Sequence, residues 1–535
     1  MNGDAFKAGI FLYLALFLAW ASADETAADR SVVDLPIAQL RQEIDSGRLT
    51  SERLTQEFLA RIEAIDRNGP RLQSIIATNP DALRQARELD KERQQGKSRG
   101  PLHGIPVLLK DNIESADPLP TTAGSLALIN NVTGRDAPIV ANLRAAGAVI
   151  LGKTNLSEWA NYRSDHSISG WSAVGGLTKN PHVLDRSACG SSAGSAVAVA
   201  AALASAAVGT ETDGSITCPA AMNGVVAIKP THGLLSGERI VPIAHSQDTA
   251  GPMARSVTGV AAMLTAMVGE KPMCLSAECK RINYVAVLDA ATLAGKRIGV
   301  WRFAPGRWPQ IDPVYERALA QLRAAGATLV EVAVPDSGGV NAGEGLVLKT
   351  EFKADLNAYL ASTPAAVKVR SLADLIAFNR RDSRETVLFA QEIFERSSAA
   401  AGLDDEAYRD ALADSRRLAG EEGITRVLRE NRLDLVVAPT AGPAWRIDLV
   451  NGDQFPGSFS TLPAVSGYPH VTVPMGVLHQ LPLGISFIGA PWSESQLLAA
   501  AYVFEQRSHA RPIPSFIASI DTTDIRIEPQ AVIRK

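Results

Sequence analysis

The sequence predicts a layered α/β fold, in which a β-sheet is covered by helices. Short apolar runs typical of buried strands alternate with amphipathic stretches typical of helices along most of the chain. Hydrophobic residues make up 46% of the 535 residues and charged residues 21%, an ordinary globular composition that can supply a sheet buried on both sides. Intrinsic disorder is therefore excluded as the main state of the chain.

The charge and the cysteine content exclude further classes of protein. The 53 basic and 57 acidic side chains give a formal net charge of −4, whereas nucleic-acid binders usually carry a basic excess. Aromatic residues, at 5%, leave few surfaces on which single-stranded bases could stack. Four cysteines are too few for a metal ribbon or a disulfide scaffold of this length. We therefore expect no nucleic-acid partner.

The first 23 residues predict an export signal peptide. Residues 8–23 read AGIFLYLALFLAWASA and carry no charge, but they are shorter than the roughly 20 apolar residues that span a membrane. They end in Ala21-Ser22-Ala23, the small-x-small pattern of a signal-peptidase site. An uncleaved membrane anchor and a buried core helix are the alternatives, and we expect membrane association only if the segment stays uncleaved. The mature chain is expected to begin near Asp24 and to be periplasmic or secreted.

Helices and strands are predicted in alternation after residue 40. Amphipathic spacing predicts helices over 40–62, and the charged run 84–99 predicts a solvated helix with its tail. Apolar runs predict strands at 105–109, 148–151, 297–300, 433–438, 471–474 and 484–488, with a helix over 141–147. The region 340–430 is mostly helical and is predicted to form a cap. No linker divides the mature chain, so residues 24–535 are predicted to form a single domain, although length alone suggests three or four.

Residues 185–233 carry the densest chemical signal. They read DRSACGSSAGSAVAVAAALASAAVGTETDGSITCPAAMNGVVAIKPTHG. The small residues between two Gly- and Ser-rich clusters would let a helix pack closely against a sheet, and the Gly-rich turns leave backbone N–H groups free to converge on an anion. From composition alone, a tightly packed internal helix with flexible ends is an equally good interpretation.

Two serines in this segment are candidate nucleophiles. Ser192 lies in a G-x-S-x-G motif at 190–194, but the nucleophile elbow needs a strand directly before it, and the preceding KNPHVLDRSAC makes a poor one. Ser215 lies in a sharp turn whose consecutive N–H groups, from Thr212 onward, could surround an oxyanion. Ser191 could relay the proton of Ser215.

A serine nucleophile needs a base, and Lys110 is the candidate. It follows the apolar run GIPVLL, so its ammonium would be poorly solvated, and desolvation lowers the pKa of a lysine until the amine can accept a proton. Taken alone, a lysine at a strand end is far more often exposed or paired. The eight histidines are scattered without a metal-site spacing, so we predict no metal ligand, while a Ser-His-Asp triad stays open as an alternative.

Together these stretches resemble the amidase signature family of Ser-Ser-Lys hydrolases. The motifs GIPVLLKDN, CGSSAGS and GTETDGSITCPAAMNGVVAIKPTHG carry the resemblance, with support from KTNLSEW at 153–159, DTAGP at 248–252 and LPLGI at 481–485. The resemblance spans nearly all of the chain after the export segment and is strongest to the bacterial peptide-amidase branch. It implies a large mixed β-sheet covered by helices on both faces, with a signature core at about 100–270.

The resemblance also implies roles for individual residues. It makes Ser215 the nucleophile, Lys110 the general base and Ser191 the bridging serine, typically preceded by a cis peptide bond after Gly190. The implied reaction converts a carboxamide, most of all the C-terminal amide of a peptide, to an acid and ammonia through an acyl-enzyme, with no cofactor or metal. Other linear, aryl or fatty acyl amides, or the role of an amidotransferase-type subunit, are the alternatives. We expect a monomer.

Three positions depart from the commonest pattern of that family. Cys189 and Ala193 replace glycines around the first serine pair, and Asp213 replaces a glycine before the nucleophile. These changes keep the backbone donors, so the N–H groups of Thr212, Asp213 and Gly214 are still implied to bind the oxyanion or the substrate. Substrate preference is thus less firmly implied than mechanism.

The remaining expectations concern cysteines and aromatic residues. Cys274 and Cys279 could close a small disulfide loop. Cys189 and Cys218 are interpreted as small buried hydrophobic side chains. Trp159, Tyr162 and Trp171 could line a substrate pocket, and are equally compatible with the core.

Overall fold

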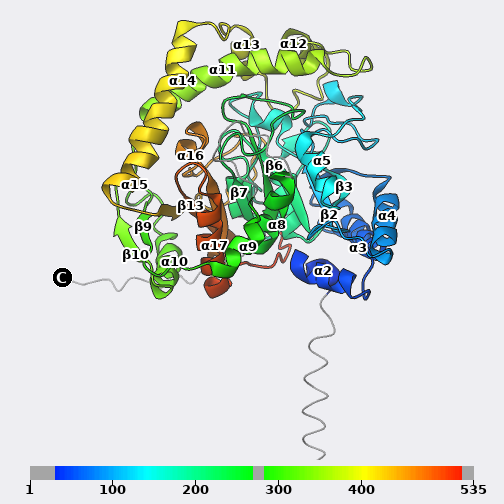
Figure 1. The fold of residues 1–535 in the computed structure, drawn as a ribbon. Coiled ribbons are helices and arrows are strands. Elements are labelled where there is room, and N and C mark those ends of the chain that lie inside the picture. Colours follow the sequence, from blue (N-terminus) through cyan, green and yellow to red (C-terminus); the bar gives the residue numbers. More distant parts are fainter. Residues whose placement is uncertain (1–30, 269–281, 521–535) are drawn as a thin grey trace, which may run out of the picture.

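The computed structural model describes residues 31–268 and 282–520 (Figure 1). The predicted export segment 1–23 and the predicted Cys274–Cys279 loop lie outside the described residues. None of the described helices is both long and apolar enough to cross a membrane.

The strands have the following bounds: β1 (Ile75–Thr78), β2 (Pro106–Lys110), β3 (Val149–Thr154), β4 (Trp171–Ser172), β5 (Gly176–Leu177), β6 (Ala206–Glu211), β7 (Val226–Lys229), β8 (Thr249–Ala254), β9 (Arg297–Val300), β10 (Thr328–Glu331), β11 (Leu435–Pro439), β12 (His470–Leu478) and β13 (Leu481–Ile488). The α-helices have the following bounds: α2 (Ile37–Asp45), α3 (Ser51–Arg61), α4 (Ala82–Gln94), α5 (Pro138–Ala145), α6 (Ala193–Ala200), α7 (Thr217–Met222), α8 (Val257–Val268), α9 (Tyr284–Val287), α10 (Asp312–Ala324), α11 (Gly338–Ala361), α12 (Leu372–Arg381), α13 (Glu392–Ser398), α14 (Glu406–Ala419), α15 (Arg426–Glu430), α16 (Thr461–Val465) and α17 (Glu494–Ser508).

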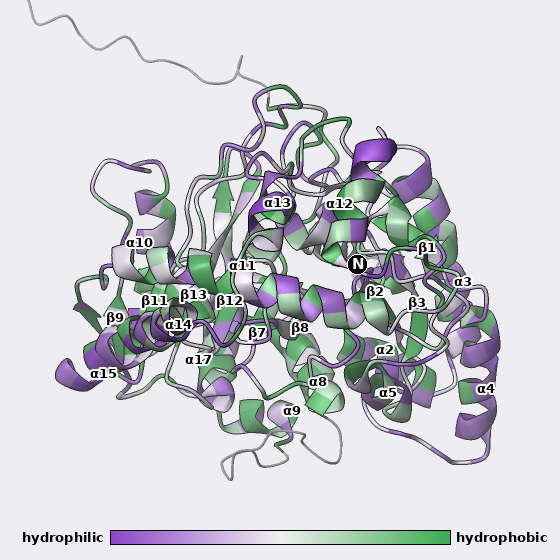
Figure 2. Ribbon diagram, turned by 90° about the horizontal axis from the view of Figure 1, so that it is seen from above, coloured by the Kyte–Doolittle hydropathy of each residue, from purple (hydrophilic) through white to green (hydrophobic). Residues whose placement is uncertain are grey.

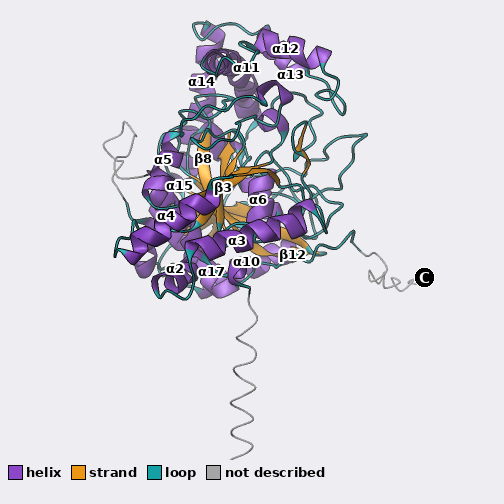
Figure 3. Cartoon of the chain, turned by 90° about the vertical axis from the view of Figure 1, so that its right-hand side faces the viewer, coloured by secondary structure: helices purple, strands orange, loops and turns teal. Residues whose placement is uncertain are grey.

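An 11-stranded mixed sheet forms the centre of the molecule. Its strand order is β1-β3-β2-β6-β8-β7-β12-β13-β11-β9-β10. Strand β2 runs parallel to its neighbours β3 and β6. At the other end of the sheet, β9 runs parallel to its neighbours β11 and β10. Each pair of neighbours from β6 to β11 in this order is antiparallel. Figure 3 shows the strands enclosed by helices, which confirms the predicted α/β fold with a large mixed sheet covered by helices.

Hydropathy follows this layered arrangement (Figure 2). The inner strands and α8 are apolar, whereas α4 and α15 at the periphery are rich in polar residues. All five residues of β2 and all six of β6 are buried, and so are all eight of α6. The central strands are therefore covered on both faces, which explains why they read as continuous apolar runs.

Helix α6 packs closely on the sheet, as the small residues in its sequence predict. A Cβ added to Gly194 would lie 2.3 Å from the Ser74 carbonyl oxygen and 2.4 Å from that of Asn155. A Cβ added to Gly209 in β6 would lie 2.8 Å from Ser192 Oγ. Glycine at both positions is what lets the helix and the strand approach.

The region 340–430 is helical, as predicted. Helices α11, α12 and α13 lie at the top of Figure 1, with α14 running down one side. Apolar side chains of α11, α12 and α13 belong to one cluster, in which Phe352 and Phe394 stack at 5.4 Å between ring centroids. This cluster includes Trp159, so the helical region packs on a loop of the first half of the chain.

Candidate active site

Lys110 is buried at the end of β2, where the sequence places it. Its side chain is 0% exposed, and its Nζ lies 2.7 Å from Ser191 Oγ, 2.8 Å from Thr210 Oγ1 and 3.2 Å from the Thr210 carbonyl oxygen. Burial lowers the pKa of Lys110 to about 7, although the carboxylates of Asp248 and Glu211 act in the opposite direction. A large fraction of the amine is therefore neutral at pH 7 and can accept a proton.

Ser191 is held against Lys110 by its backbone. The Gly190–Ser191 peptide bond is cis, which is the geometry that the resemblance implies. The Ser157 N–H donates to the Ser191 carbonyl oxygen at 3.0 Å, and a Cβ on Gly190 would lie 2.2 Å from Ser157 Oγ. The close approach of Ser157 therefore favours glycine before the serine, because any larger residue would displace the Ser157 hydroxyl.

Ser215 lies between β6 and α7, in a turn fixed by the carboxylate of Glu211. Glu211 Oε2 accepts hydrogen bonds from the N–H groups of Ile216 at 2.7 Å and Thr217 at 2.9 Å. Within the described residues, the N–H groups of Thr212, Asp213, Gly214 and Ser215 donate to no protein acceptor. The turn thus leaves the predicted donors of Thr212, Asp213 and Gly214 free, together with that of Ser215, and backbone donors of this kind can stabilise an oxyanion.

The two serine segments are adjacent. The Ser192 N–H donates to the Ser215 carbonyl oxygen at 3.1 Å, and Ser191 Oγ contacts Lys110 on the other side. Within the described residues, no hydrogen bond joins the hydroxyls of Ser191 and Ser215. Catalytic hydrogen bonds often tighten only in the enzyme–substrate complex.

A cavity of about 420 Å³ opens onto Ser215. Gly190 and the turn 212–214 contribute to its wall, together with Tyr162. Trp159 and Trp171 are instead buried in apolar clusters, so only one of the three aromatic residues considered lines this cavity. The cavity has room for part of a peptide and places that ligand beside Ser215.

Ser192 is occupied by backbone contacts. It is fully buried, its hydroxyl donates to the Thr210 carbonyl oxygen at 3.0 Å, and it accepts from the Thr210 N–H at 3.2 Å. It opens α6 without a sheet strand directly before it. The nucleophile-elbow alternative therefore has no support from this geometry, and Ser192 instead joins α6 to β6.

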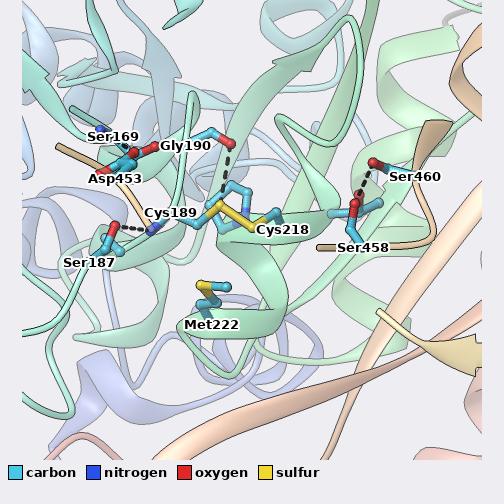
Figure 4. The surroundings of a disulfide bond; sticks show 12 residues. Ser169, Ser187, Cys189, Gly190, Cys218, Met222, Asp453, Ser458 and Ser460 are labelled. Carbon is cyan, nitrogen blue, oxygen red and sulfur yellow. Dashed lines mark hydrogen bonds between the residues drawn. A yellow bond between two sulfur atoms is a disulfide. The ribbon is translucent and has the colours of Figure 1, made fainter. Parts of the chain in front are cut away.

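Cys189 and Cys218 form a disulfide, so their interpretation as free, small hydrophobic side chains was wrong (Figure 4). Their Cα atoms are 6.1 Å apart, and 29 positions separate them in the sequence. Both are nearly fully buried, as expected, but the fold brings α7 against the segment before α6, a proximity that sequence spacing does not reveal. Both cysteines also line the cavity.

Asp213 is held by the first residue of α16. Its Oδ2 accepts from the Thr461 hydroxyl at 2.7 Å, while burial raises the pKa of the carboxyl group. The aspartate that replaces the family's glycine at position 213 is therefore accommodated by a hydrogen bond from the second half of the chain. The backbone N–H of Asp213 stays available to bind an oxyanion.

Several polar residues around Lys110 were missed by the sequence reasoning. Thr210 contacts the amine directly, and Asn112 Nδ2 donates to Thr210 Oγ1 at 3.0 Å. Asp248 accepts from the Thr212 hydroxyl and from the N–H groups of Ile243 and Ala244, and burial raises its pKa to about 6. Asn112 belongs to the same motif as Lys110, whereas Thr210 and Asp248 lie in GTETD and DTAGP, and nothing in the sequence places these two motifs beside Lys110.

A second cavity, of about 680 Å³, lies next to the same layer of residues. Asn112, Thr210 and Asp248 line it, together with apolar residues of the loop 235–243. At its edge, His245, Glu351 and Asp355 place possible metal-ligand atoms within 4.8 Å of one another. The backbone N–H of His245 donates to Asp355 Oδ2 at 2.8 Å, and the ring nitrogen Nδ1 of His245 lies 2.9 Å from the same oxygen. These three side chains are therefore explained as a hydrogen-bonded contact between the loop that carries His245 and α11.

The chain is similar to known proteins over most of its length. The Amidase family model matches residues 53–498. The native peptide amidase from Stenotrophomonas maltophilia is 51% identical, with a TM-score of 0.86 over 90% of this chain and 99% of that chain. A probable amidase of Arabidopsis thaliana is 38% identical over 526 residues, 95% of this chain and 97% of the relative. One subunit of the glutamyl-tRNA(Gln) amidotransferase of Symbiobacterium thermophilum is 32% identical over 89% of this chain and 98% of its own length.

Proposed function

Because the chain belongs to the amidase family and is an amide-hydrolysing enzyme, we propose that it converts the C-terminal carboxamide of peptides to a free acid and ammonia. The observation that carries the proposal is the buried Lys110 amine 2.7 Å from Ser191 Oγ, next to a cavity lined by Ser215. The 51% identity to a peptide amidase supports the choice of peptide amides over other amides.

In the proposed first step, Ser215 Oγ attacks the carbonyl carbon of the amide. Its proton passes to Ser191 Oγ, and the proton of Ser191 passes to the neutral amine of Lys110. The negative charge that develops on the carbonyl oxygen is stabilised by the free N–H groups of residues 213–215. Since these donors are fixed by the turn before the reaction begins, little reorganisation is needed in the transition state.

In the second step the C–N bond breaks. The proton on Lys110 returns through Ser191 to the leaving nitrogen, which departs as ammonia and leaves an acyl ester on Ser215. Water then attacks the ester and gives a proton to the same relay, which returns it to Ser215 Oγ as the bond to the acyl group breaks and the peptide acid is released. Lys110 is neutral before each attack, which its burial favours.

The test is the release of ammonia from an amidated dipeptide by the purified chain. We expect Ser215→Ala and Lys110→Ala each to lower kcat by several orders of magnitude, because members of one relay act as a unit. Ser195→Ala is a matched control, since Ser195 lies in α6, which begins two residues after Ser191, and its hydroxyl donates to the Val208 carbonyl oxygen at 3.0 Å. Full activity of Ser215→Ala together with no activity of Ser192→Ala would contradict the proposal.

A second candidate function is that of an amidotransferase-type subunit, favoured by the 32% identity to one chain of such a complex. A protein of this kind would act on an amide together with partner chains. Turnover of a small peptide amide by the isolated chain at kcat above about 1 s⁻¹, an ordinary value for an enzyme, would argue against that function.

We further propose that the chain is exported. The apolar segment 8–23 with its small-x-small end supports this, and so does the Cys189–Cys218 disulfide, because disulfides persist mainly outside the cytoplasm. N-terminal sequencing of the chain recovered from an exporting bacterial host should begin near Asp24. Recovery of the intact N-terminus from the cytoplasmic fraction would contradict export.

A further inference from the structure

The Cys189–Cys218 disulfide joins the two segments that carry the catalytic serines. Cys189 directly precedes Gly190 and Ser191, and Cys218 follows Ser215 by three residues as the second residue of α7. We propose that this disulfide is a positioning element, which holds Ser191 and Ser215 in register for proton transfer, so that the rate of amide hydrolysis depends on its oxidation state. This inference rests on the proposed function of the two serines.

The segment around Ser191 and the segment around Ser215 are joined by hydrogen bonds, but none of these bonds links Ser191 itself to α7. On one side, Asn223 Nδ2 donates to the Ala188 carbonyl oxygen at 2.8 Å. On the other side, the Ser192 N–H donates to the Ser215 carbonyl oxygen at 3.1 Å. Within the described residues, Cys189, Gly190 and Ser191 make no hydrogen bond to residues 212–222. The disulfide is therefore the direct link across this short stretch.

The remaining contacts of this stretch point away from α7. Ser191 contacts Lys110 through its hydroxyl and Ser157 through its carbonyl oxygen, while the Cys189 N–H donates to Ser187 Oγ at 3.1 Å. These contacts fix Ser191 relative to β2 and to the segment after β3, but none of them is made to Ser215. That distance matters, because proton transfer needs oxygen atoms about 2.6–3.2 Å apart, and a displacement of about 1 Å can lower the rate about 100-fold.

The disulfide also belongs to the wall of the substrate cavity. Cys189 and Cys218 both line it, between Ser169 and Asp453 on one side and Ser458 and Ser460 on the other (Figure 4). Both cysteines belong to an apolar cluster that also includes Met222 and Trp445. Because the other members of this cluster remain packed when the sulfur–sulfur bond is absent, we expect the fold to survive the loss of the disulfide while the serine geometry loosens.

The test compares chains with and without this disulfide in a Cys274→Ser/Cys279→Ser background, so that a reductant acts on Cys189 and Cys218 alone. Kinetics on an amidated dipeptide give kcat and KM, and a fluorophosphonate probe reports the reactivity of the nucleophilic serine. For Cys189→Ser/Cys218→Ser we expect kcat and the labelling rate to fall together by about 10- to 100-fold, with KM changed less than threefold. Met222→Leu, in the same apolar cluster, is the control and should change neither rate.

Reduction of the parent protein provides a second measurement that needs no substitution in the site. Here the parent protein is the Cys274→Ser/Cys279→Ser chain, and mass spectrometry verifies that its reduction gives two free thiols. Reduction should lower its kcat to the value of the Cys189→Ser/Cys218→Ser variant, and reoxidation should restore it. The same reductant should leave the double variant unchanged. A reduced or substituted chain that keeps its circular dichroism spectrum and its full kcat and labelling rate would overturn the inference. Absence of ammonia release by the oxidised parent would instead contradict the proposed function itself.

Discussion

At the residue scale, the charge of Lys110 is set by opposing effects. Complete burial disfavours the ammonium form and lowers the pKa to about 7, while the carboxylates of Asp248 and Glu211 favour that form. Thr210 supplies two oxygen acceptors for the N–H groups of a neutral amine, which leaves the lone pair for the Ser191 hydroxyl. The site thus favours a base that is ready near neutral pH.

This balance predicts the pH dependence of the enzyme. The neutral amine is the active form, so kcat/KM should rise with pH through about pH 7 and level off above it, as Lys110 loses its proton. Initial rates of ammonia release between pH 5 and pH 9 measure the midpoint. A profile that is flat from pH 5 to pH 8 would contradict Lys110 as the base.

Replacing one carboxylate should move that midpoint. Asp248→Asn removes a negative charge that raises the pKa of Lys110, so the midpoint of kcat/KM should shift to lower pH. Asn keeps an oxygen acceptor for the N–H groups of Ile243 and Ala244, which limits structural change. Asp453→Asn is the control, because Asp453 lines the substrate cavity but is not among the charges that shift Lys110. Equal midpoints in all three proteins would rule out this electrostatic role for Asp248.

At the scale of elements, the close packing of α6 predicts a strong dependence on glycine. Gly194→Ala would place a methyl group within 2.6 Å of three backbone atoms and should lower the free energy of unfolding by about 1–3 kcal/mol or more. Gly345→Ala, inside α11 with open space around its Cβ, should be neutral or stabilise by up to about 1 kcal/mol. Urea denaturation of both variants measures the difference, and equal stabilities would contradict the packing argument.

The disulfide adds stability besides its proposed positional role. By loop-closure entropy, cross-linking across 29 positions stabilises a fold by about 3–4 kcal/mol. Cys189→Ser/Cys218→Ser should therefore lower the free energy of unfolding by an amount of this order, measured by urea denaturation. A change below about 1 kcal/mol would mean that the unfolded chain gains little freedom when the bond is absent.

Element prediction succeeded where apolar runs are continuous. The stretch 105–109 matches β2 closely because Val, Leu and Ile dominate it, and the stretch 297–300 matches β9, in which Ile298 and Val300 alternate with Arg and Gly. Strands β6 and β8 were missed, since AAVGTE and TAGPMA are made of small residues that do not resemble a strand. Their smallness has a steric cause: a Cβ on Gly251 in β8 would lie 2.1 Å from the Ile228 carbonyl oxygen. Neighbouring elements in the fold impose this composition.

At the scale of the whole molecule, one sheet runs through both halves of the chain. The β7–β12 pairing, with Ile228 opposite Val471, joins strands from the first half to strands from the second. The same division appears at the site, where Lys110 and both serines come from the first half while Ser460 and Thr461 of the second half contact the turn before Ser215.

A shared sheet predicts that the two halves unfold together. Urea unfolding followed by far-ultraviolet circular dichroism and by tryptophan fluorescence should give one coincident transition, as expected of a single cooperative unit. Two separated transitions would contradict the prediction of a single domain over residues 24–535.

More of the candidate site than of the surrounding fold could be predicted from the sequence. Family-like motifs led to Lys110, Ser191 and Ser215, and the structure places the first two in contact and the third at the cavity. The Cys189–Cys218 bond and the contacts of Asp248 could not be predicted, because they depend on how β6, β8 and α7 approach one another in space.

The most direct measurement for the central claim is mapping of the serine that reacts. The purified chain, treated with a fluorophosphonate probe and digested, should carry the label on Ser215 alone by mass spectrometry. The same labelling should be at least about 100-fold slower in Lys110→Ala, because the relay would lack its base. Label on Ser192 or another serine, or an unchanged labelling rate in Lys110→Ala, would contradict the Ser215–Ser191–Lys110 relay.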